Sequence, residues 1–458
     1  MILERIKSEG IAHLSYFLGS GNSAAVIDPR RDIDIYLELA RRHGMQIKFI
    51  FETHRNEDYV VGSLELAGPT GATIYHGPVQ DFKYGKVLLD GQEFELGKLR
   101  LIALRTPGHS DDSMSYAVVD KATGQAPALV FTGDALFVNE TGRVDFGGLS
   151  NIPRMASDLF ESLFNRLLLL GDGVIICPGH GAGSICGSRI AEREESTIGL
   201  EKLNNPALKH TDKASFIRYK SAEQHEKPPY FSLMEKYNLE GAPLLKGLPL
   251  PPALNPSEFK TALEKGALVI DTNLPAAFGG SHVRGAYNIW LGGLPTFTGW
   301  FLPYDKPILL ILENDLHLET ATRYLIRIGY DNLAGYLKNG VEAWYNAGYP
   351  LEKLNLLSVH ELKAKIDRSE NFTLLDVREP EAWRAGHIAG SKNIYVGHIQ
   401  QKLAEIPADR PVVVLCSVGR RAGVACSLLL RAGYTQVYNV LGSMTAWRQA
   451  EYPVVNQK

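Results

Sequence analysis

The chain has 458 residues, of which 45% are hydrophobic and 22% charged, and its formal net charge is −3. These values exclude a disordered chain, give no reason to expect nucleic acid or an anionic membrane as a partner, and predict about three globular domains. No apolar run approaches the roughly 20 residues that a membrane helix needs, and the first residues lack a signal peptide's apolar stretch. Because four cysteines are too few for a disulfide scaffold, we expect a cytoplasmic protein with reduced thiols.

Short β-rich runs that end in polar loops characterise the N-terminal part of the chain. KFIFETH, ATIYHG, LRLIALRTPGH and ALVFTGDALF each predict a strand that runs into a loop. The stretch MASDLFESLFNRLLLL has helical periodicity, and GVIICPGHG then repeats the strand-to-loop pattern. Side chains of the types that bind metals therefore gather at strand ends, namely His54, His109, Asp134 and His180.

The loop HRNEDY, at residues 54–59, matches a known metal-binding pattern only in part. The pattern His-x-His-x-Asp-His finds its first histidine in His54 and its aspartate in Asp58. Asn56 and Tyr59 stand where the pattern has its other two histidines. The site is therefore either inactive or built for a different metal from the one that the full pattern binds.

These loops together resemble the metallo-β-lactamase superfamily in spacing and order, over roughly residues 1–245. The resemblance implies an αββα sandwich with metal ligands in the loops. In dinuclear hydrolases of this superfamily, one metal would use positions 54, 56, 109 and 134, and the other 58, 59, 134 and 180. The ligand set that survives here is His54, His109 and Asp134. Two imidazoles and one carboxylate are the ligands of non-haem Fe(II) oxygenases, whereas zinc hydrolases prefer more nitrogen ligands.

Within the superfamily, the region looks like the persulfide dioxygenase branch. The stretches THRNEDYVVGSLEL, TPGHSDDSMSY, FTGDALFVNETGRVDF and CPGHGAGSICG carry this likeness. It implies one Fe(II) per chain and oxidation of a thiol persulfide to sulfite and thiol. It also implies that Asp58, Tyr59 and His180 contact the ligands or the metal-bound water. Arg143 is a candidate to bind an anionic part of the substrate, and the alternative is an arginine that braces its loop.

An internal repeat follows a Pro-, Gly- and Leu-rich linker around residues 240–256. The stretch at 268–289 parallels the one at 374–394, and 306–330 aligns with 410–434 without a gap. Each unit alternates an apolar strand with a helix, which predicts two small α/β domains with parallel sheets. We therefore predict domains at 1–245, 255–352 and 353–458.

The second repeat carries a cysteine where an apolar strand gives way to a helix, in VVVLCSVGRR. A Cys416 thiolate there would be stabilised by the helix N-terminus and by Arg420 and Arg421. Gly419 permits the tight loop in which backbone amides surround an anion. The loop resembles the active-site loop of rhodanese sulfurtransferases over about residues 355–455. Four residues between Cys416 and Arg421 make a ring suited to a sulfane sulfur, whereas rhodanese-like phosphatases have five.

The first repeat places Leu312 opposite Cys416 and His317 opposite Arg421. Without a thiol it looks like an inactive rhodanese homologue that acts as a spacer, an oligomerisation surface or a thiol-binding module. The whole chain resembles a persulfide dioxygenase–rhodanese fusion with a small-molecule thiol persulfide, O2 and sulfite or thiosulfate as partners. A homo-oligomer is also expected. A glyoxalase II-like zinc thioesterase and a sulfur-carrier or redox-sensing protein are the alternatives.

Overall fold

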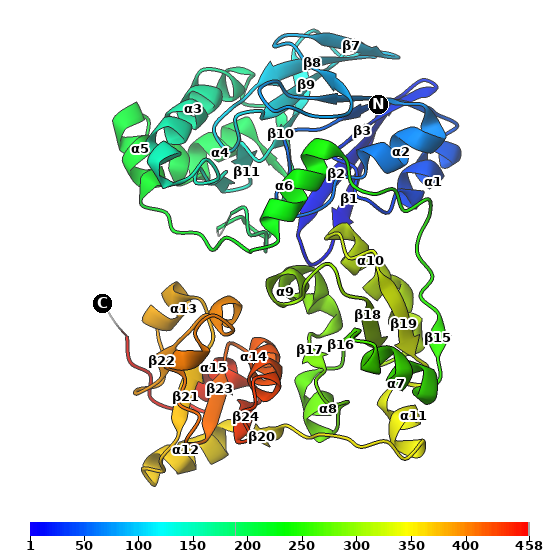
Figure 1. Cartoon of the computed structure of the whole chain (residues 1–458). Helices are drawn as coiled ribbons and strands as arrows, with labels where there is room; N and C mark the ends of the chain where they lie inside the picture. Colours follow the sequence, from blue (N-terminus) through cyan, green and yellow to red (C-terminus); the bar gives the residue numbers. More distant parts are fainter. Residues whose placement is uncertain (188, 457–458) are drawn as a thin grey trace. The chain divides into compact units, whose positions relative to one another are not determined.

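The computed structural model describes residues 1–187 and 189–456. The chain forms two compact units, one of Met1–Leu248 with Ile326–Gly329, and one of Pro249–Leu325 with Tyr330–Lys458 (Figure 1). In the described part of the chain, no helix has both the length and the apolar character required to cross a bilayer.

Two mixed β-sheets pack face to face in the first unit (Figure 1). One sheet has the strand order β1 (Ile2–Ser8), β2 (His13–Ser20), β3 (Ser23–Ile27), β4 (Gln46–Phe51), β5 (Thr73–His76) and β6 (Lys86–Val87). The other has the order β14 (Ser196–Thr197), β13 (Ile175–Pro178), β10 (Pro127–Gly133), β9 (Met114–Asp120), β8 (Leu99–Arg105) and β7 (Glu93–Leu96). Aromatic side chains of both sheets, such as Phe51 and Phe131, fill the space between them.

Helices cover the outer face of each sheet. Because side chains alternate along a strand, Tyr16 and Leu18 face the inner core while Phe17 faces the helices. The first sheet is covered by α1 (Asp34–Arg42) and α2 (Ser63–Thr70), and the second by α3 (Ile152–Phe164), α4 (Ile198–Asn204) and α5 (Lys213–Ser221). The result is the αββα sandwich that the sequence predicts.

The helix predicted for residues 155–170 begins earlier and ends earlier than expected. It starts at Ile152, with Pro153 in its first turn, where proline's missing N–H removes no helical hydrogen bond. It ends at Phe164, with Asn165 as its C-cap, and Leu167–Leu169 form a separate 3-10 turn. Leu167 and Leu168 are still buried in the same cluster as Leu159, so the apolar run continues although the helix does not.

The second unit contains two parallel sheets with the same connectivity. The first has the order β15 (Ala253–Leu254), β19 (Leu333–Leu337), β18 (Ile308–Ile311), β16 (Leu268–Asp271) and β17 (Tyr287–Asn288). The second has the order β20 (Asn355–Leu357), β24 (Val437–Val440), β23 (Val412–Leu415), β21 (Thr373–Asp376) and β22 (Lys392–Asn393). Asp271 pairs with Ile311 as Asp376 pairs with Leu415, so the sequence repeat is also a repeat of register.

The helices of the second unit begin with strong local signals. Asn255 with Glu258, and Ser358 with Glu361, form capping boxes that satisfy the free amides of the first turns of α7 and α12. The helices of the unit are α7 (Pro256–Glu264), α8 (Pro275–Gly280), α9 (Leu294–Phe301), α10 (Leu318–Arg327), α11 (Gly340–Asn346), α12 (Val359–Asp367), α13 (Pro380–Arg384), α14 (Arg420–Arg431) and α15 (Ser443–Gln449).

The predicted linker lies between α6 (Phe231–Glu240) and β15, where residues 241–252 form neither helix nor strand. The division between the two units falls within this stretch, at Leu248 and Pro249. The individual domain limits at 245, 255, 352 and 353 stay predictions.

Candidate functional site

Strand direction brings the predicted ligands of the first unit together. β8 and β10 both run antiparallel to β9, and β13 runs parallel to β10, so β8, β10 and β13 end at the same edge of their sheet. His109, Asp134 and His180 follow these three strands. The other sheet contributes His54, which follows β4.

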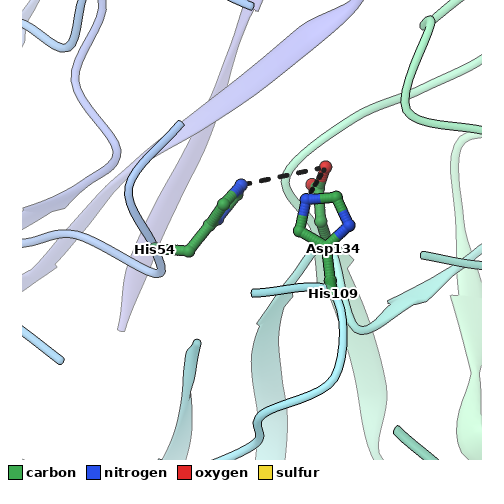
Figure 2. A group of neighbouring side chains, drawn as sticks. All are labelled: His54, His109 and Asp134. Atoms are coloured by element: carbon green, nitrogen blue, oxygen red, sulfur yellow. Dashed lines mark ion pairs between the residues drawn. The ribbon is translucent and has the colours of Figure 1, made fainter. Parts of the chain in front are cut away.

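His54, His109 and Asp134 form one buried cluster (Figure 2). One ligand atom from each lies within 4.8 Å of the others. The Nε2 atoms of His54 and His109 are 4.0 Å and 3.6 Å from Asp134 Oδ2. These distances are too long for hydrogen bonds, and the three side chains are at most 3% exposed. The arrangement is that of side chains around a shared centre rather than of an ordinary ion pair.

A hydrogen bond at Nδ1 of each imidazole ring determines that Nε2 is the nitrogen that faces this centre. His54 Nδ1 donates to Thr53 Oγ1 over 2.9 Å, and this hydroxyl donates to Asp28 over 2.7 Å. His109 Nδ1 donates to the backbone oxygen of Arg143 over 3.1 Å. Both Nε2 atoms are buried and lack a hydrogen-bond partner among the described residues. Metal-binding histidines are held in this way, so the residues fit a metal ion.

His180 holds the Asp134 carboxylate in place. Its Nδ1 lies 2.8 Å from Asp134 Oδ1, and its Nε2 lies 2.9 Å from Asp58 Oδ2. Burial alone would raise the pKa of Asp134, but His180 and then His54 and His109 outweigh it and hold that pKa below its usual range. The carboxylate therefore stays charged and available to a cation.

The two residues that replace histidines point to other partners. The Asn56 amide donates to the His54 backbone oxygen over 3.2 Å. The ring of Tyr59 lies against His13, with centroids 4.0 Å apart, and its buried hydroxyl has no partner among the described residues. Asn238 of α6 donates to the backbone oxygens of both residues over 2.7 Å and so fixes the loop.

Glu57 is the residue that the sequence analysis missed. Its side chain is fully buried, and Glu57 Oε2 lies 3.8 Å from His54 Nε2 and 3.6 Å from His109 Nε2. Burial would raise the pKa of Glu57, but the His109 and His54 rings reverse this and hold it below its ordinary value. A glutamate at a position that the metal-binding pattern leaves free was the available signal.

Arg143 has a bracing role in the structure. Its buried guanidinium pairs with both oxygens of Asp145 at 2.6 Å and donates to the backbone oxygens of Ile185 and Glu226. It also lies 4.6 Å from the centre of the Phe146 ring. Since these contacts engage the guanidinium, the geometry favours the loop-bracing alternative, and substrate binding by Arg143 stays a prediction.

A second group of potential ligands surrounds His180. Asp58, His180 and Cys186 each offer an atom within 4.8 Å of the others. Both nitrogens of His180 are already hydrogen-bonded, so this group lacks the free ring nitrogen that the first cluster has. A cavity of about 470 Å³ borders this second group at His180, with His13, Gly181 and Arg193 among its other lining residues.

The Cys416 loop of the second unit joins β23 to α14. Cys416 follows β23 and is 1% exposed, and the Gly419 amide donates to its Sγ over 3.1 Å. Gly419 adopts φ +96°, a conformation that favours glycine, and begins α14 as its N-cap. The Cys416 amide is held by Ser443 Oγ at 3.1 Å. The structure thus places the thiol at a helix N-terminus, inside its loop.

The two arginines of this loop differ in their surroundings. Arg421 donates to Ser417 Oγ over 2.9 Å and pairs with Glu379, so it braces the ring of the loop. Burial would lower the pKa of Arg421, but Glu379 and Cys416 reverse this and raise it. Arg420 is exposed, and its guanidinium lies 5.9 Å from the centre of the Trp290 ring in the preceding domain.

That preceding domain presents a hydrocarbon side chain at the matching position. Leu312 follows β18 as Cys416 follows β23, and it is 3% exposed. The gap-free alignment of the two repeats therefore agrees with their strand order and register. A leucine side chain has no group that can carry sulfur.

Gly133 offers a test of how the fold positions the metal ligands. It has φ +49°, and a Cβ atom there would lie 2.7 Å from the Thr53 side chain. Gly133→Ala should strain the backbone by about 1–2 kcal/mol and also displace Thr53 and Asp134. Metal bound per chain should fall in a protein that still folds. Gly91→Ala is the control, because its φ is +77° and no atom lies within 4 Å of its Cβ position. Equal metal content in both variants would contradict this positioning role.

Family models match both parts of the chain. The metallo-beta-lactamase superfamily model matches residues 9–180. The rhodanese-like domain model matches residues 255–347 and again residues 358–450. The fold class predicted from the sequence is therefore confirmed.

Individual relatives agree with these matches. An uncharacterised protein of Mycobacterium tuberculosis is 35% identical over 215 residues, which are 41% of this chain and 88% of the relative. A hydroxyacylglutathione hydrolase of Brucella anthropi is 30% identical over 199 residues, 38% of this chain and 71% of the relative. A crystal structure of a metallo-beta-lactamase from Staphylococcus aureus has 31% identity and a TM-score of 0.66, and the match covers 74% of this chain and 98% of that one. The chain thus belongs to the metallo-beta-lactamase superfamily through its first unit and carries two rhodanese-like domains in its second.

Proposed function

We propose that the protein oxidises a low-molecular-weight thiol persulfide to sulfite and thiol, and transfers sulfane sulfur through Cys416. The observation that carries the proposal is the cluster of two imidazoles and one carboxylate at His54, His109 and Asp134. This ligand set is typical of Fe(II) sites that keep positions open for O2 and substrate. The presence of a rhodanese-like thiol loop in the same chain supports sulfur as the substrate element.

The oxidation balances without a further reductant. One persulfide, one O2 and one water give one thiol, one sulfite and two protons, and the terminal sulfur supplies the electrons that reduce O2. Iron(II), when bound at this site, supplies the redox chemistry. The protein's part is to hold the ligands in position. Thr53 with Asp28 orients His54, the Arg143 backbone oxygen orients His109, and His180 orients Asp134. Burial of the cluster keeps bulk water away from the reaction.

Sulfur transfer needs one nucleophile and a loop that stabilises anions. The Cys416 thiolate attacks the outer sulfur of a donor such as thiosulfate, the bond to the donor breaks, and sulfite leaves with the electron pair. The persulfide on Cys416 then passes its outer sulfur to an acceptor thiolate, or the reaction runs in reverse and forms thiosulfate. The Gly419 amide and the α14 N-terminus stabilise the negative charge on sulfur. One site makes the sulfite that the other uses, and both act on small molecules of the cytoplasm.

A zinc thioesterase of the glyoxalase II kind is the second candidate. The identity with a relative named hydroxyacylglutathione hydrolase favours it. Such an enzyme needs two metals or a firmly held activated water, and Asn56 and Tyr59 remove an imidazole from each of the two metal positions. A protein that only carries or senses sulfur would accept it on Cys416 without consuming O2.

The metal assignment is tested by His54→Ala and Asp134→Ala. Each removes a ligand, so iron content and persulfide-dependent O2 uptake should be lost together, each by more than about tenfold. Iron per chain after anaerobic purification and O2 consumption with glutathione persulfide are the two measurements. His43→Ala, at the end of α1, should change neither. Full iron occupancy in both ligand variants would show that the ligands are wrongly assigned. Two zinc ions per chain and no O2 uptake in the unmodified protein would instead support the zinc thioesterase.

The sulfur-transfer site is tested by Cys416→Ser. Formation of thiosulfate from sulfite and a sulfane-sulfur donor should fall to background, because serine cannot carry the sulfur, while O2 uptake at the first site continues. Cys426→Ser is the matched control, since Cys426 is a fully buried thiol within α14 and is not part of the loop. Persistence of thiosulfate formation in Cys416→Ser would rule out this cysteine as the carrier.

A further inference from the structure

Glu57 places a second carboxylate at the metal cluster. Its side chain is fully buried, and neither carboxylate oxygen has a hydrogen-bond partner among the described residues. Its Oε2 atom lies 3.8 Å from His54 Nε2 and 3.6 Å from His109 Nε2. We propose that Glu57 is a fourth protein ligand of the metal, in place of the histidine that the loop lacks at position 56.

The first argument is the desolvation of these groups. A buried carboxylate without hydrogen bonds is strongly unfavourable unless a cation lies beside it. The Nε2 atoms of His54 and His109 are also buried and without partners. All three residues direct these atoms toward one another, so a single cation at their centre satisfies each of them. No protonation of Glu57 is required.

The second argument is the conformation of the loop. Asn238 donates to the backbone oxygens of Asn56 and Tyr59 and accepts the Val61 amide at 2.9 Å. The Asn56 side chain is used in a hydrogen bond to the His54 backbone oxygen. The loop is therefore clamped from α6 while Glu57 faces His54 and His109. Loss of one imidazole is offset by a carboxylate from the next residue.

A fourth protein ligand limits which metal ion could still bind substrate at this site. Four protein ligands complete the shell of a tetrahedral zinc ion and leave no position for substrate. An octahedral ion such as Fe(II) or Mn(II) keeps two positions, enough for O2 and one sulfur anion. Two carboxylates also balance the charge of a divalent ion and, as hard oxygen ligands, suit Fe(II) or Mn(II). The Glu57 ligand thus argues against zinc hydrolysis at this site.

The inference rests on the metal site of the proposed function and not on its reaction, so the test measures metal binding directly. The full chain is freed of metal and titrated anaerobically with Fe(II) against a competing chelator. In Glu57→Gln the dissociation constant should rise on the order of 100-fold, and the rise in melting temperature on metal loading should shrink. Glu57→Asp, which retains a carboxylate, should lose less affinity than Glu57→Gln. The ligand-field absorption of the Co(II)-loaded protein should change in both variants.

Glu52→Gln is the matched control. Glu52 is a buried glutamate five residues earlier, but Tyr84 donates to its carboxylate, so it has a partner. Its substitution should leave Fe(II) affinity and the Co(II) spectrum unchanged. Wild-type affinity and spectrum in Glu57→Gln would overturn the inference, whatever the enzyme's activity. Iron binding that depends on Glu57 in a protein that consumes no O2 would uphold the inference and refute the proposed dioxygenase. If Glu57→Gln does not fold, an unchanged Co(II) spectrum in Glu57→Asp overturns the inference.

Discussion

The first unit is organised around charged and polar groups that it buries at one edge of its two sheets. The Nε2 atoms of His54 and His109, which lack hydrogen-bond partners among the described residues, lie 3.6–4.0 Å from the carboxylates of Glu57 and Asp134. Burying such groups without compensation is strongly unfavourable, so the arrangement fits a cation at their centre. Hydrogen bonds from Thr53, His180 and Asn238 hold these loops and their side chains in position.

The sheets explain why residues so far apart in sequence can meet this condition. Three strands of one sheet end together because β9 reverses the chain between β8 and β10, and β13 returns parallel to β10. The fourth loop comes from the opposite sheet, which the aromatic core fixes against the first. Partners behind the ligands then set their orientation: Thr53 and Asp28 for His54, and His180 for Asp134. A metal-binding loop can lose two histidines in this setting because most of the site lies outside the loop.

The parts of the site that could be predicted from the sequence are those with a strong local signal. His54, His109 and Asp134 each follow an apolar run, and Cys416 lies between a strand and a helix whose repeat is visible in the chain. Glu57 lies at a position that the metal-binding pattern leaves free, and its direction depends on Asn238, which is 181 residues away and holds the loop from α6. The role of Arg143 was also undecided from the sequence, since only the folded chain shows Asp145 and two backbone oxygens around its guanidinium. Long-range contacts such as these decide the direction of a side chain, and local patterns do not contain them.

The two rhodanese-like domains share one topology and differ at the position of the thiol. Strand order and register are the same in both, yet the residue that follows the fourth strand along the chain is Leu312 in one domain and Cys416 in the other. The thiol-free domain packs against the helix that follows Cys416: a Cβ atom on Gly423 would lie 2.6 Å from Asn288 Oδ1.

The same face of that helix makes two cation–aromatic contacts with the thiol-free domain. The Arg431 guanidinium lies 3.8 Å from the centre of the Tyr287 ring, and Arg420, from the Cys416 loop itself, lies 5.9 Å from the centre of the Trp290 ring. Because α14 begins in the Cys416 loop, contacts that fix α14 also fix the surroundings of the thiol. These contacts join the two rhodanese-like domains at the helix that begins in the Cys416 loop.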